Sequence, residues 1–261
     1  FIFLTNGEDT LFWDYPNSST RKVMGFFTRD ELMQRRKQIQ SSSDPTTIKI
    51  NESITERPYQ REAIKRVMEG IAKNKRKFLL TLATGTGKTR IAMSIIEILT
   101  RAEKINRVLF LTDRNALKQQ AMGDLGSSGF KQFFPNEIKR YLTSGHLEPA
   151  KLYAGTIQTL AEIYKELSPG YFDLIISDEA HRSIQGVAWN PILSYFDAIQ
   201  IGLTATPSEL VDKNTFDQFD CFDGKPTFNF SYEDAVNSTP PYLSRYQVLE
   251  THKKEILALG H

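Results

Sequence analysis

The residues best suited to chemistry lie in the stretch LLTLATGTGKTR, at residues 79–90. An apolar run leads into a loop that contains Gly85 and Gly87, and Lys88 and Thr89 follow where a helix is expected to begin. Glycines let main-chain amides turn around phosphate oxygens, and the helix start adds positive potential. A lysine at this spacing reaches the β and γ phosphates, and a threonine hydroxyl can bind Mg²⁺.

The stretch therefore predicts a phosphate-binding loop at residues 83–89, called the phosphate loop below. Thr84 and Thr86 are expected to contribute to it, together with the glycines, Lys88 and Thr89. The strict pattern places Gly or Ala where this chain has Leu82, but the succession of strand, loop and helix is intact. The alternative interpretation is a plain glycine turn.

A second candidate group follows the apolar run in DLIISDEAHRS, where Asp178 and Glu179 stand at the expected end of a strand. Ligands bind at the carboxyl edge of such sheets. Asp178 is predicted to hold Mg²⁺ through its water shell, and Glu179 to orient or deprotonate the water that attacks the γ phosphate. An acidic pair in this position can also be a simple helix N-cap.

Three further side chains are candidates for the same edge. Gln60, in RPYQ, carries an amide that can both donate and accept and so can bind an adenine edge. Thr204 and Thr206, in GLTATP, end another expected strand and are predicted to relay the nucleotide state. A surface glutamine at a helix start, and threonines placed by β propensity and turn chemistry, are the alternatives.

These side chains need a sheet whose strands end at one edge, and the sequence predicts one. Apolar segments at FLLTL, RVLFLT, KLYAGT, FDLIISD and IQIGLTAT alternate with helical stretches such as RIAMSIIEILT and PILSYFDA. Strands that alternate with helices indicate an α/β fold with a mostly parallel sheet covered on both faces. RPYQREAIKRVMEGIAK is predicted to be the first helix of this domain.

The segments before and after the predicted α/β domain show other patterns. Around Asn6 and Gly7 the pattern predicts a β-hairpin with a two-residue turn, and Thr28 with Glu31 predicts a capping box that starts a polar helix. SSSDPTTIKINESITE looks like a linker. After Pro207 the pattern becomes irregular, and this tail is expected to leave the main domain.

Composition limits the classes of protein that fit. The 33 basic and 31 acidic residues give a net charge of +2, too balanced to indicate nucleic-acid binding by itself. No apolar run is long enough for a membrane span, and the single cysteine, Cys221, cannot form an internal disulfide. The expected location is the cytoplasm. The basic run KNKRK is predicted to be a solvated turn at the end of a helix.

The order of the motifs resembles that of superfamily 2 helicases and translocases. The segments that carry this resemblance are RPYQ, ATGTGKT, VLFLTDRNALKQQA, GTIQTL, DEAHRS and GLTATP. More narrowly, TDRNALKQQA, DEAHRS and YFDAIQIGLTATP are similar to the motor (R) subunit of type I restriction enzymes, as is the opening FIFLTNGEDTLFWDY.

This resemblance implies a role for each matching residue. Gln60 would contact adenine, Lys88 and Thr89 the phosphates and Mg²⁺, and Asp178 and Glu179 the metal and the water. His181, Thr204 and Thr206 would couple the state of ATP to DNA, whereas Arg114, Thr156 and Gln158 would contact the nucleic-acid backbone. Contacts to phosphates rather than bases suit a motor that moves over any sequence.

The resemblance also implies a domain division and partners. Residues 1–50 would be the end of a nuclease-lobe region with a linker, 51–225 the first RecA-like P-loop NTPase domain, and 226–261 a connector with the start of a second RecA-like domain. Nuclease residues and an arginine finger are expected outside this chain. ATP, Mg²⁺, double-stranded DNA, and specificity and methyltransferase subunits would be the cofactors and partners.

Three alternatives remain open at this point. The chain could belong to another superfamily 2 helicase of a defence or repair system. As residues 1–261 it could act only as a nucleotide- and DNA-binding module, because the arginine finger lies elsewhere. A small-molecule kinase also uses a phosphate loop, but DEAH followed by TAT has no use in such an enzyme.

Overall fold

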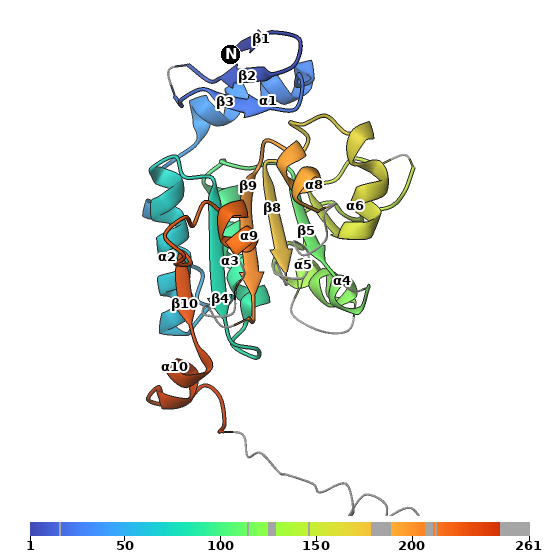
Figure 1. The fold of residues 1–261 in the computed structure, drawn as a ribbon. Coiled ribbons are helices and arrows are strands. Elements are labelled where there is room, and N and C mark those ends of the chain that lie inside the picture. The colour runs from blue at the N-terminus through green and yellow to red at the C-terminus, as the bar shows by residue number, and fades with distance from the viewer. Residues whose placement is uncertain are drawn as a thin grey trace, which may run out of the picture.

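The computed structural model describes residues 1–15, 17–113, 115–124, 129–145, 147–178, 189–206, 211 and 213–245, with the backbone alone at 189 and 190. Arg114, Glu179 and His181 therefore lie outside the described residues. Two sheets are present, a small antiparallel one near the N-terminus and a seven-stranded parallel one (Figure 1).

The N-terminal unit consists of β1 (Ile2–Thr5), β2 (Thr10–Trp13), β3 (Arg21–Val23) and α1 (Arg29–Ser41). The expected hairpin is present, but the prediction of a two-residue turn is wrong, because Thr5 pairs with Thr10 and residues 6–9 form the loop. The Asn6 side-chain oxygen accepts hydrogen bonds from the main-chain N–H groups of residues 8 and 9, which stabilises the longer loop. The predicted capping box of Thr28 and Glu31 is confirmed.

A short 3-10 helix, η1 (Pro45–Thr47), lies between this unit and the main domain and packs on α2 (Pro58–Ala72). The strands of the main sheet are β4 (Lys77–Leu82), β5 (Val108–Thr112), β6 (Lys139–Tyr141), β7 (Leu152–Thr156), β8 (Leu174–Asp178), β9 (Ile199–Thr204) and β10 (Phe228–Phe230). The remaining helices are α3 (Lys88–Arg101), α4 (Asn115–Met122), α5 (Phe130–Phe133), α6 (Ile157–Ile163), η2 (Tyr164–Glu166), α8 (Trp189–Tyr195), α9 (Lys213–Gln218) and α10 (Tyr232–Asn237).

The strand order is β10-β4-β9-β8-β5-β7-β6, and neighbouring strands are parallel throughout. The predicted α/β class and parallel sheet are thus confirmed. The sequence did not predict β10, which comes from the tail expected to leave the domain. Its three residues pair with Leu80, Thr81 and Leu82 of β4, so the main sheet extends beyond the predicted boundary at residue 225.

Alternate residues of the buried strands face two separate cores. Phe78 and Leu80 of β4 pack with α2, α3, α4 and α5 on one face. Leu79 packs with α9 on the other face, where Leu109 and Ile175 join α6 and α8. A parallel sheet needs both faces covered, and these helices provide the cover (Figure 1). No helix of the described residues is long and apolar enough to cross a membrane.

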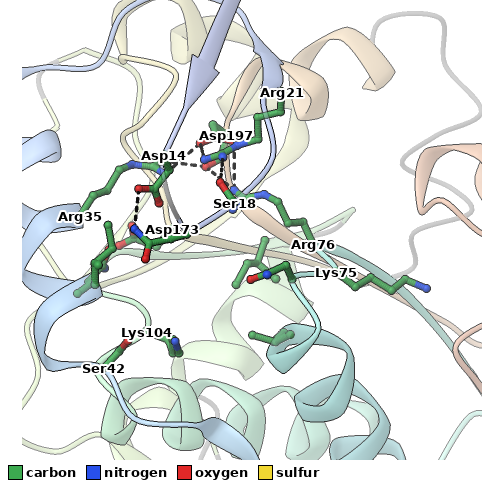
Figure 2. A pocket seen from close by; sticks show the side chains of 16 residues that line it. Asp14, Ser18, Arg21, Arg35, Ser42, Lys75, Arg76, Lys104, Asp173 and Asp197 are labelled. Carbon is green, nitrogen blue, oxygen red and sulfur yellow. Dashed lines mark hydrogen bonds and ion pairs between the residues drawn. The ribbon is translucent and has the colours of Figure 1, made fainter. Parts of the chain in front are cut away.

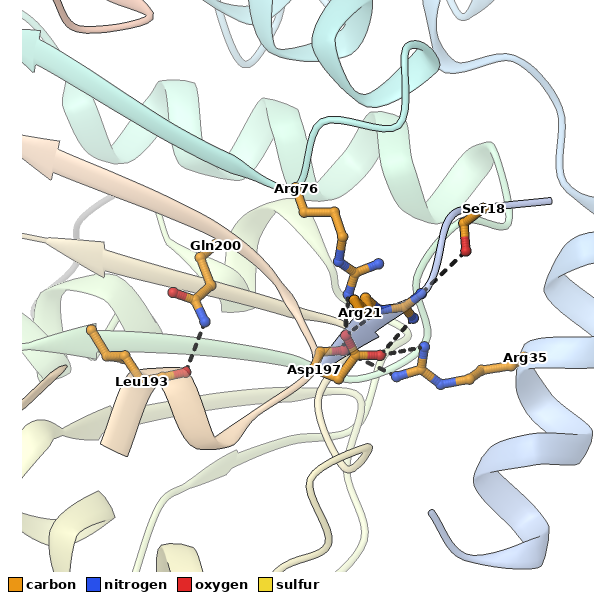
Figure 3. Close-up of polar contacts among 7 residues, drawn as sticks. All are labelled: Ser18, Arg21, Arg35, Arg76, Leu193, Asp197 and Gln200. Atoms are coloured by element: carbon orange, nitrogen blue, oxygen red, sulfur yellow. Dashed lines mark hydrogen bonds and ion pairs between the residues drawn. The ribbon is translucent and has the colours of Figure 1, made fainter. Parts of the chain in front are cut away.

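A buried carboxylate joins the N-terminal unit to the amino edge of the main sheet (Figure 3). Asp197, just before β9, accepts hydrogen bonds from Arg21 of β3 at 2.7 Å to each carboxylate oxygen. Arg35 of α1 lies 3.0 Å from the same carboxylate, and Arg76, just before β4, lies 3.1 Å from it. These four residues are called the Asp197 cluster below. They connect three parts of the chain that are far apart in sequence.

The ionisation of Asp197 depends on this cluster. Its side chain is only 6% exposed, and burial alone would raise the pKa of the carboxyl group. The charge of Arg76 and the hydrogen bonds and charges of Arg21 and Arg35 outweigh burial and hold this pKa well below its ordinary range. The carboxylate is therefore ionised whenever the protein is folded near neutral pH.

We predict that Asp197→Asn lowers the free energy of unfolding at pH 7 by about 3–5 kcal/mol, because removing one partner of a buried ion pair leaves the arginines uncompensated. Denaturant unfolding measures this. A depressed pKa contributes stability that is present above the unfolded-state pKa, about 4, and is lost as pH falls through the folded-state pKa. The difference in the free energy of unfolding between the unchanged protein and Asp197→Asn should therefore become smaller below about pH 4.

Asp9→Asn is the matched control, since Asp9 pairs with Lys22 but both side chains are more than half exposed, at 53% and 61%. An exposed ion pair contributes less than about 1 kcal/mol to the free energy of unfolding. Equal losses in the two variants would contradict the role assigned to the Asp197 cluster.

Candidate functional site at the carboxyl edge of the sheet

The phosphate loop connects the end of β4 to the first residue of α3. Gly85 and Gly87 have φ angles of +83° and +87°, in the left-handed region that glycine adopts without strain. Gly87 is the N-cap of α3, a helix of 14 residues whose first turn leaves main-chain N–H groups without partners inside the helix. The loop therefore has main-chain geometry suited to an anion, and the binding of phosphate there remains a prediction.

The side chains of the loop differ in exposure. Thr84 is exposed, and Lys88 and Thr89 are half-buried. Thr86, in contrast, is fully buried, and its hydroxyl donates a 2.6 Å hydrogen bond to the carbonyl of Ala83. The hydroxyl of Thr86 thus holds the loop in shape, so its predicted contribution to binding is through the main chain.

Two side chains from the first turn of α2 support the loop from behind. The amide nitrogen of Gln60 donates to the carbonyl oxygen of Thr86 at 2.9 Å, and the hydroxyl of Tyr59 donates to the same oxygen at 2.6 Å. A Cβ atom on Gly87 would lie 2.6 Å from the Gln60 amide nitrogen, so this contact also requires glycine at 87. Sequence reasoning missed Tyr59, although an aromatic residue directly before Gln60 was available as a signal.

The segment after β10 returns to the same loop. Tyr59 stacks on Phe230 with ring centroids 3.9 Å apart, and Tyr242 meets Tyr59 edge-on at 4.9 Å. The side chain of Leu243 lies 3.2 Å from the place that a Cβ atom on Gly85 would occupy. Residues 242 and 243 therefore lie beside the phosphate loop rather than extending away from the domain.

The strand order brings the remaining candidates beside the loop. Thr204 at the end of β9 pairs with Thr81 of β4, and Asp178 at the end of β8 pairs with Leu203 of β9. Asp178 is 8% exposed and Thr204 is fully buried. The hydroxyl oxygen of Thr204 accepts a 3.1 Å hydrogen bond from the main-chain N–H of Thr206. The coupling roles predicted for these threonines remain predictions.

A cleft of about 780 Å³ opens at this edge, between the ends of β4, β9 and β10. Thr84 and Thr206 lie on its wall together with Ser231 and Glu233 at the start of α10. The cleft thus places two of the predicted site residues on one surface beside the phosphate loop.

Two of the three residues predicted to contact nucleic acid, Thr156 and Gln158, lie farther along the same edge. Thr156 ends β7 opposite Thr112 of β5, and its hydroxyl oxygen accepts a hydrogen bond from the N–H of Thr159 as the N-cap of α6. Gln158 is exposed on the first turn of α6. The structure thus gives Thr156 a capping role and leaves Gln158 open to a ligand.

The donor set suits Mg²⁺ rather than a metal held by protein alone. The described residues contain no cluster of three or more His, Cys, Asp or Glu side chains that could hold a metal ion. One hydroxyl from Thr89 and one carboxylate from Asp178 match the preference of Mg²⁺, which keeps waters and binds substrate phosphates.

The comparison with protein families identifies the group. Residues 53–209 match the family described as "Type III restriction enzyme, res subunit", and the chain belongs to this family. The predicted resemblance to the superfamily 2 helicase region of a restriction enzyme subunit is confirmed.

Individual relatives agree with this assignment. The chain is 34% identical over 204 residues to the type I restriction enzyme EcoAI endonuclease subunit of Escherichia coli, a match that covers 74% of this chain and 24% of that protein. A fragment of a putative HsdR subunit of a type I restriction enzyme from Vibrio vulnificus YJ016 superimposes with a TM-score of 0.56 at 27% identity, covering 90% of this chain and 42% of the other. The Hef helicase domain of Pyrococcus furiosus superimposes with a TM-score of 0.52 at 27% identity, and the match covers 75% of this chain and 42% of that one.

We predict that Tyr59→Phe weakens the binding of a fluorescent ATP analogue about threefold to tenfold. The variant removes one hydrogen bond to the Thr86 carbonyl, and such a bond is worth about 0.5–1.5 kcal/mol. Titration of the purified chain measures the affinity. Tyr195→Phe is the control, because Tyr195 also donates to a main-chain carbonyl, that of Leu167 at 2.7 Å, but far from the loop. Similar affinities for both variants would contradict the supporting role of Tyr59.

Proposed function

We propose that this chain is the nucleotide-binding half of an ATP-driven motor that moves along double-stranded DNA in a type I restriction enzyme. The observation that carries the proposal is the convergence of the phosphate loop, Gln60, Thr204 and Asp178 on one edge of a parallel sheet. The match to the EcoAI subunit covers about a quarter of that protein, 24% of its length, so the activity of a whole enzyme is part of the proposal.

The phosphate loop would bind the phosphates of ATP. The main-chain N–H groups at the start of α3 and the ammonium group of Lys88 would contact the β and γ phosphates. Thr89 and Asp178 would hold Mg²⁺, which would neutralise charge that develops on the transferring phosphoryl group. Glu179 would orient the attacking water.

The adenine base would be bound on the side of the phosphate loop that faces α2. Because the amide nitrogen of Gln60 already donates to Thr86, its carbonyl oxygen is the atom suited to accept a hydrogen bond from the adenine amino group. One side chain would then contact both the base and the loop that holds the phosphates. Loss of Gln60 would therefore affect the position of the phosphates as well as the choice of base.

Movement of the motor along DNA requires that ATP binding change the affinity of the chain for the DNA backbone. Thr204, Thr206 and His181 would transmit the nucleotide state, since β9 and β8 end beside the phosphate loop. Arg114, Thr156 and Gln158 would contact the DNA backbone along the neighbouring strands β5 and β7. Phosphate contacts carry no sequence information, which suits a motor and leaves site recognition to a separate specificity subunit.

The rest of the proposed enzyme would lie outside this chain. Nuclease residues, an arginine finger in a second RecA-like domain, and specificity and methyltransferase subunits would complete it, in the cytoplasm. Residues 1–50 would be the end of the nuclease-lobe region, and residues after 230 would lead to the second domain.

A helicase that separates strands is the second candidate, favoured by the likeness to the Hef helicase domain. Two assays on the full-length subunit with its partners distinguish them. A translocase displaces a third strand from a triplex and leaves a labelled duplex intact, whereas a helicase releases a labelled strand from the duplex. ATP hydrolysis that DNA and the partner subunits never stimulate would exclude both motors.

We predict that residues 1–261 alone bind ATP but hydrolyse it about 10³- to 10⁵-fold more slowly than the complete motor, since an arginine finger contributes a factor of this size. Lys88→Ala should abolish binding of the fluorescent ATP analogue. Lys65→Ala is the control, because this exposed lysine pairs with Glu69 on the same helix. Brisk turnover by the isolated chain would contradict the prediction.

A further inference from the structure

A second cavity lies on the opposite edge of the main sheet from the phosphate loop. It has a volume of about 250 Å³, is partly open to solvent, and lies between the N-terminal unit and the segments that lead into β4, β8 and β9 (Figure 2). The Asp197 cluster forms one wall, and α1 forms another. The candidate nucleotide site described above does not include any of these residues.

The lining of this cavity is positively charged. Four cationic side chains face three carboxylates, which leaves a net charge of +1. The cations are Arg21, Arg35, Arg76 and Lys104, and the carboxylates are Asp14, Asp173 and Asp197. The ammonium group of Lys75 points away from the cavity and lies over the ring of Phe78 (Figure 2). An excess of positive charge in a partly closed space favours an anion.

Each carboxylate already has partners. Asp197 binds three guanidinium groups, and Asp173 accepts hydrogen bonds from the main-chain N–H groups of residues 106 and 107 at 2.8 and 2.9 Å. Asp14 accepts one from Asn17 at 3.2 Å. Outside the lining, Asp44 faces Lys104. Burial is the largest cause that lowers the pKa of Arg76, Asp197 opposes it, and repulsion from Arg21 and Arg35 adds to the lowering.

Two donor atoms of α1 lack partners at the same cavity. The Nε atom of Arg35 and the amide nitrogen of Gln38 are both inaccessible to solvent, and neither has a hydrogen-bond partner among the described residues. Positions 35 and 38 are three residues apart, so they lie on one face of the helix. A buried donor without a partner costs about 1–3 kcal/mol, which an acceptor in the cavity would recover.

We propose that this cavity binds a phosphate group. Its oxygens would accept hydrogen bonds from Arg35 and Gln38 after a small rotation of these side chains opens the Nε atom and the amide nitrogen to the cavity, and its negative charge would balance the excess at the Asp197 cluster and Lys104. The volume is below the roughly 300–1,000 Å³ of sites for whole small molecules, so one phosphate group fits better than a nucleotide. The group could be free inorganic phosphate or a phosphate of the DNA backbone.

Such a phosphate would bridge the N-terminal unit and the main domain. Arg35 and Gln38 belong to α1, whereas Arg76 and Lys104 belong to the segments before β4 and after α3. Binding would add contacts between the two parts, so the stability of the chain should rise with phosphate concentration.

The test measures thermal unfolding of the chain against inorganic phosphate, with ionic strength held constant by chloride. The Lys88→Ala background is used because the phosphate loop also binds phosphate. The melting temperature should rise and saturate. Gln38→Leu in this background should raise the half-saturating phosphate concentration at least about fivefold, as expected for one lost hydrogen bond.

Gln40→Leu is the matched control, since Gln40 is exposed on the same helix and should leave the half-saturating concentration unchanged. Without phosphate, Gln38→Leu should unfold at the same temperature as its parent or higher, because it removes an unpartnered donor; this shows that the variant folds. Lys104→Gln is a second variant expected to weaken binding. Two results would overturn the proposal. One is a melting temperature that does not rise, or does not saturate, with phosphate in the Lys88→Ala background. The other is an equal half-saturating phosphate concentration for Gln38→Leu and Gln40→Leu.

Binding of a short duplex by fluorescence anisotropy then identifies the source of the phosphate. If Gln38→Leu weakens duplex binding several-fold and free phosphate competes with the duplex, the DNA backbone supplies the group. If Gln38→Leu loses phosphate binding but binds the duplex like Gln40→Leu, the ligand is free phosphate. Both outcomes are separate from the proposed motor activity, because neither requires ATP hydrolysis.

Discussion

The parallel direction of the seven strands determines where the functional groups of this chain can lie. All carboxyl ends meet at one edge, so the phosphate loop, Asp178 and Thr204 become neighbours although long segments separate them in sequence. All amino ends meet at the other edge, where Asp197 receives the N-terminal unit. The two edges therefore differ, with the candidate nucleotide site at one and the attachment of the N-terminal unit at the other.

Much of the fold could be predicted from the sequence, and the failures have physical reasons. The five long apolar segments are strands because both their faces are buried, and the phosphate loop follows from its glycine spacing. The strands β3, β6 and β10 have three residues each, too few to show a period of two. Residues 228–230 become a strand because β4 offers them a free edge, which is a tertiary effect.

The candidate site could be predicted as a set of residues but not as an arrangement. Glycine spacing and residue type indicated Gln60, Lys88 and Asp178, whereas the contacts of Gln60 and Tyr59 with the Thr86 carbonyl depend on how α2 packs. Asp197 gives no local signal, since Arg21 lies 176 residues before it and Arg76 lies 121 residues before it. Charges that meet across such distances become visible only in the folded chain.

The position of β4 in the strand order has a consequence for how the protein is made. Its two neighbours, β9 and β10, both come much later in the chain than β4 does. During synthesis the strand that leads into the phosphate loop therefore has no partner until residue 204 has emerged, and its outer edge stays open until residue 230. Pairings this distant in sequence form slowly, so the edges of β4 are open to aggregation in a newly made chain at this stage.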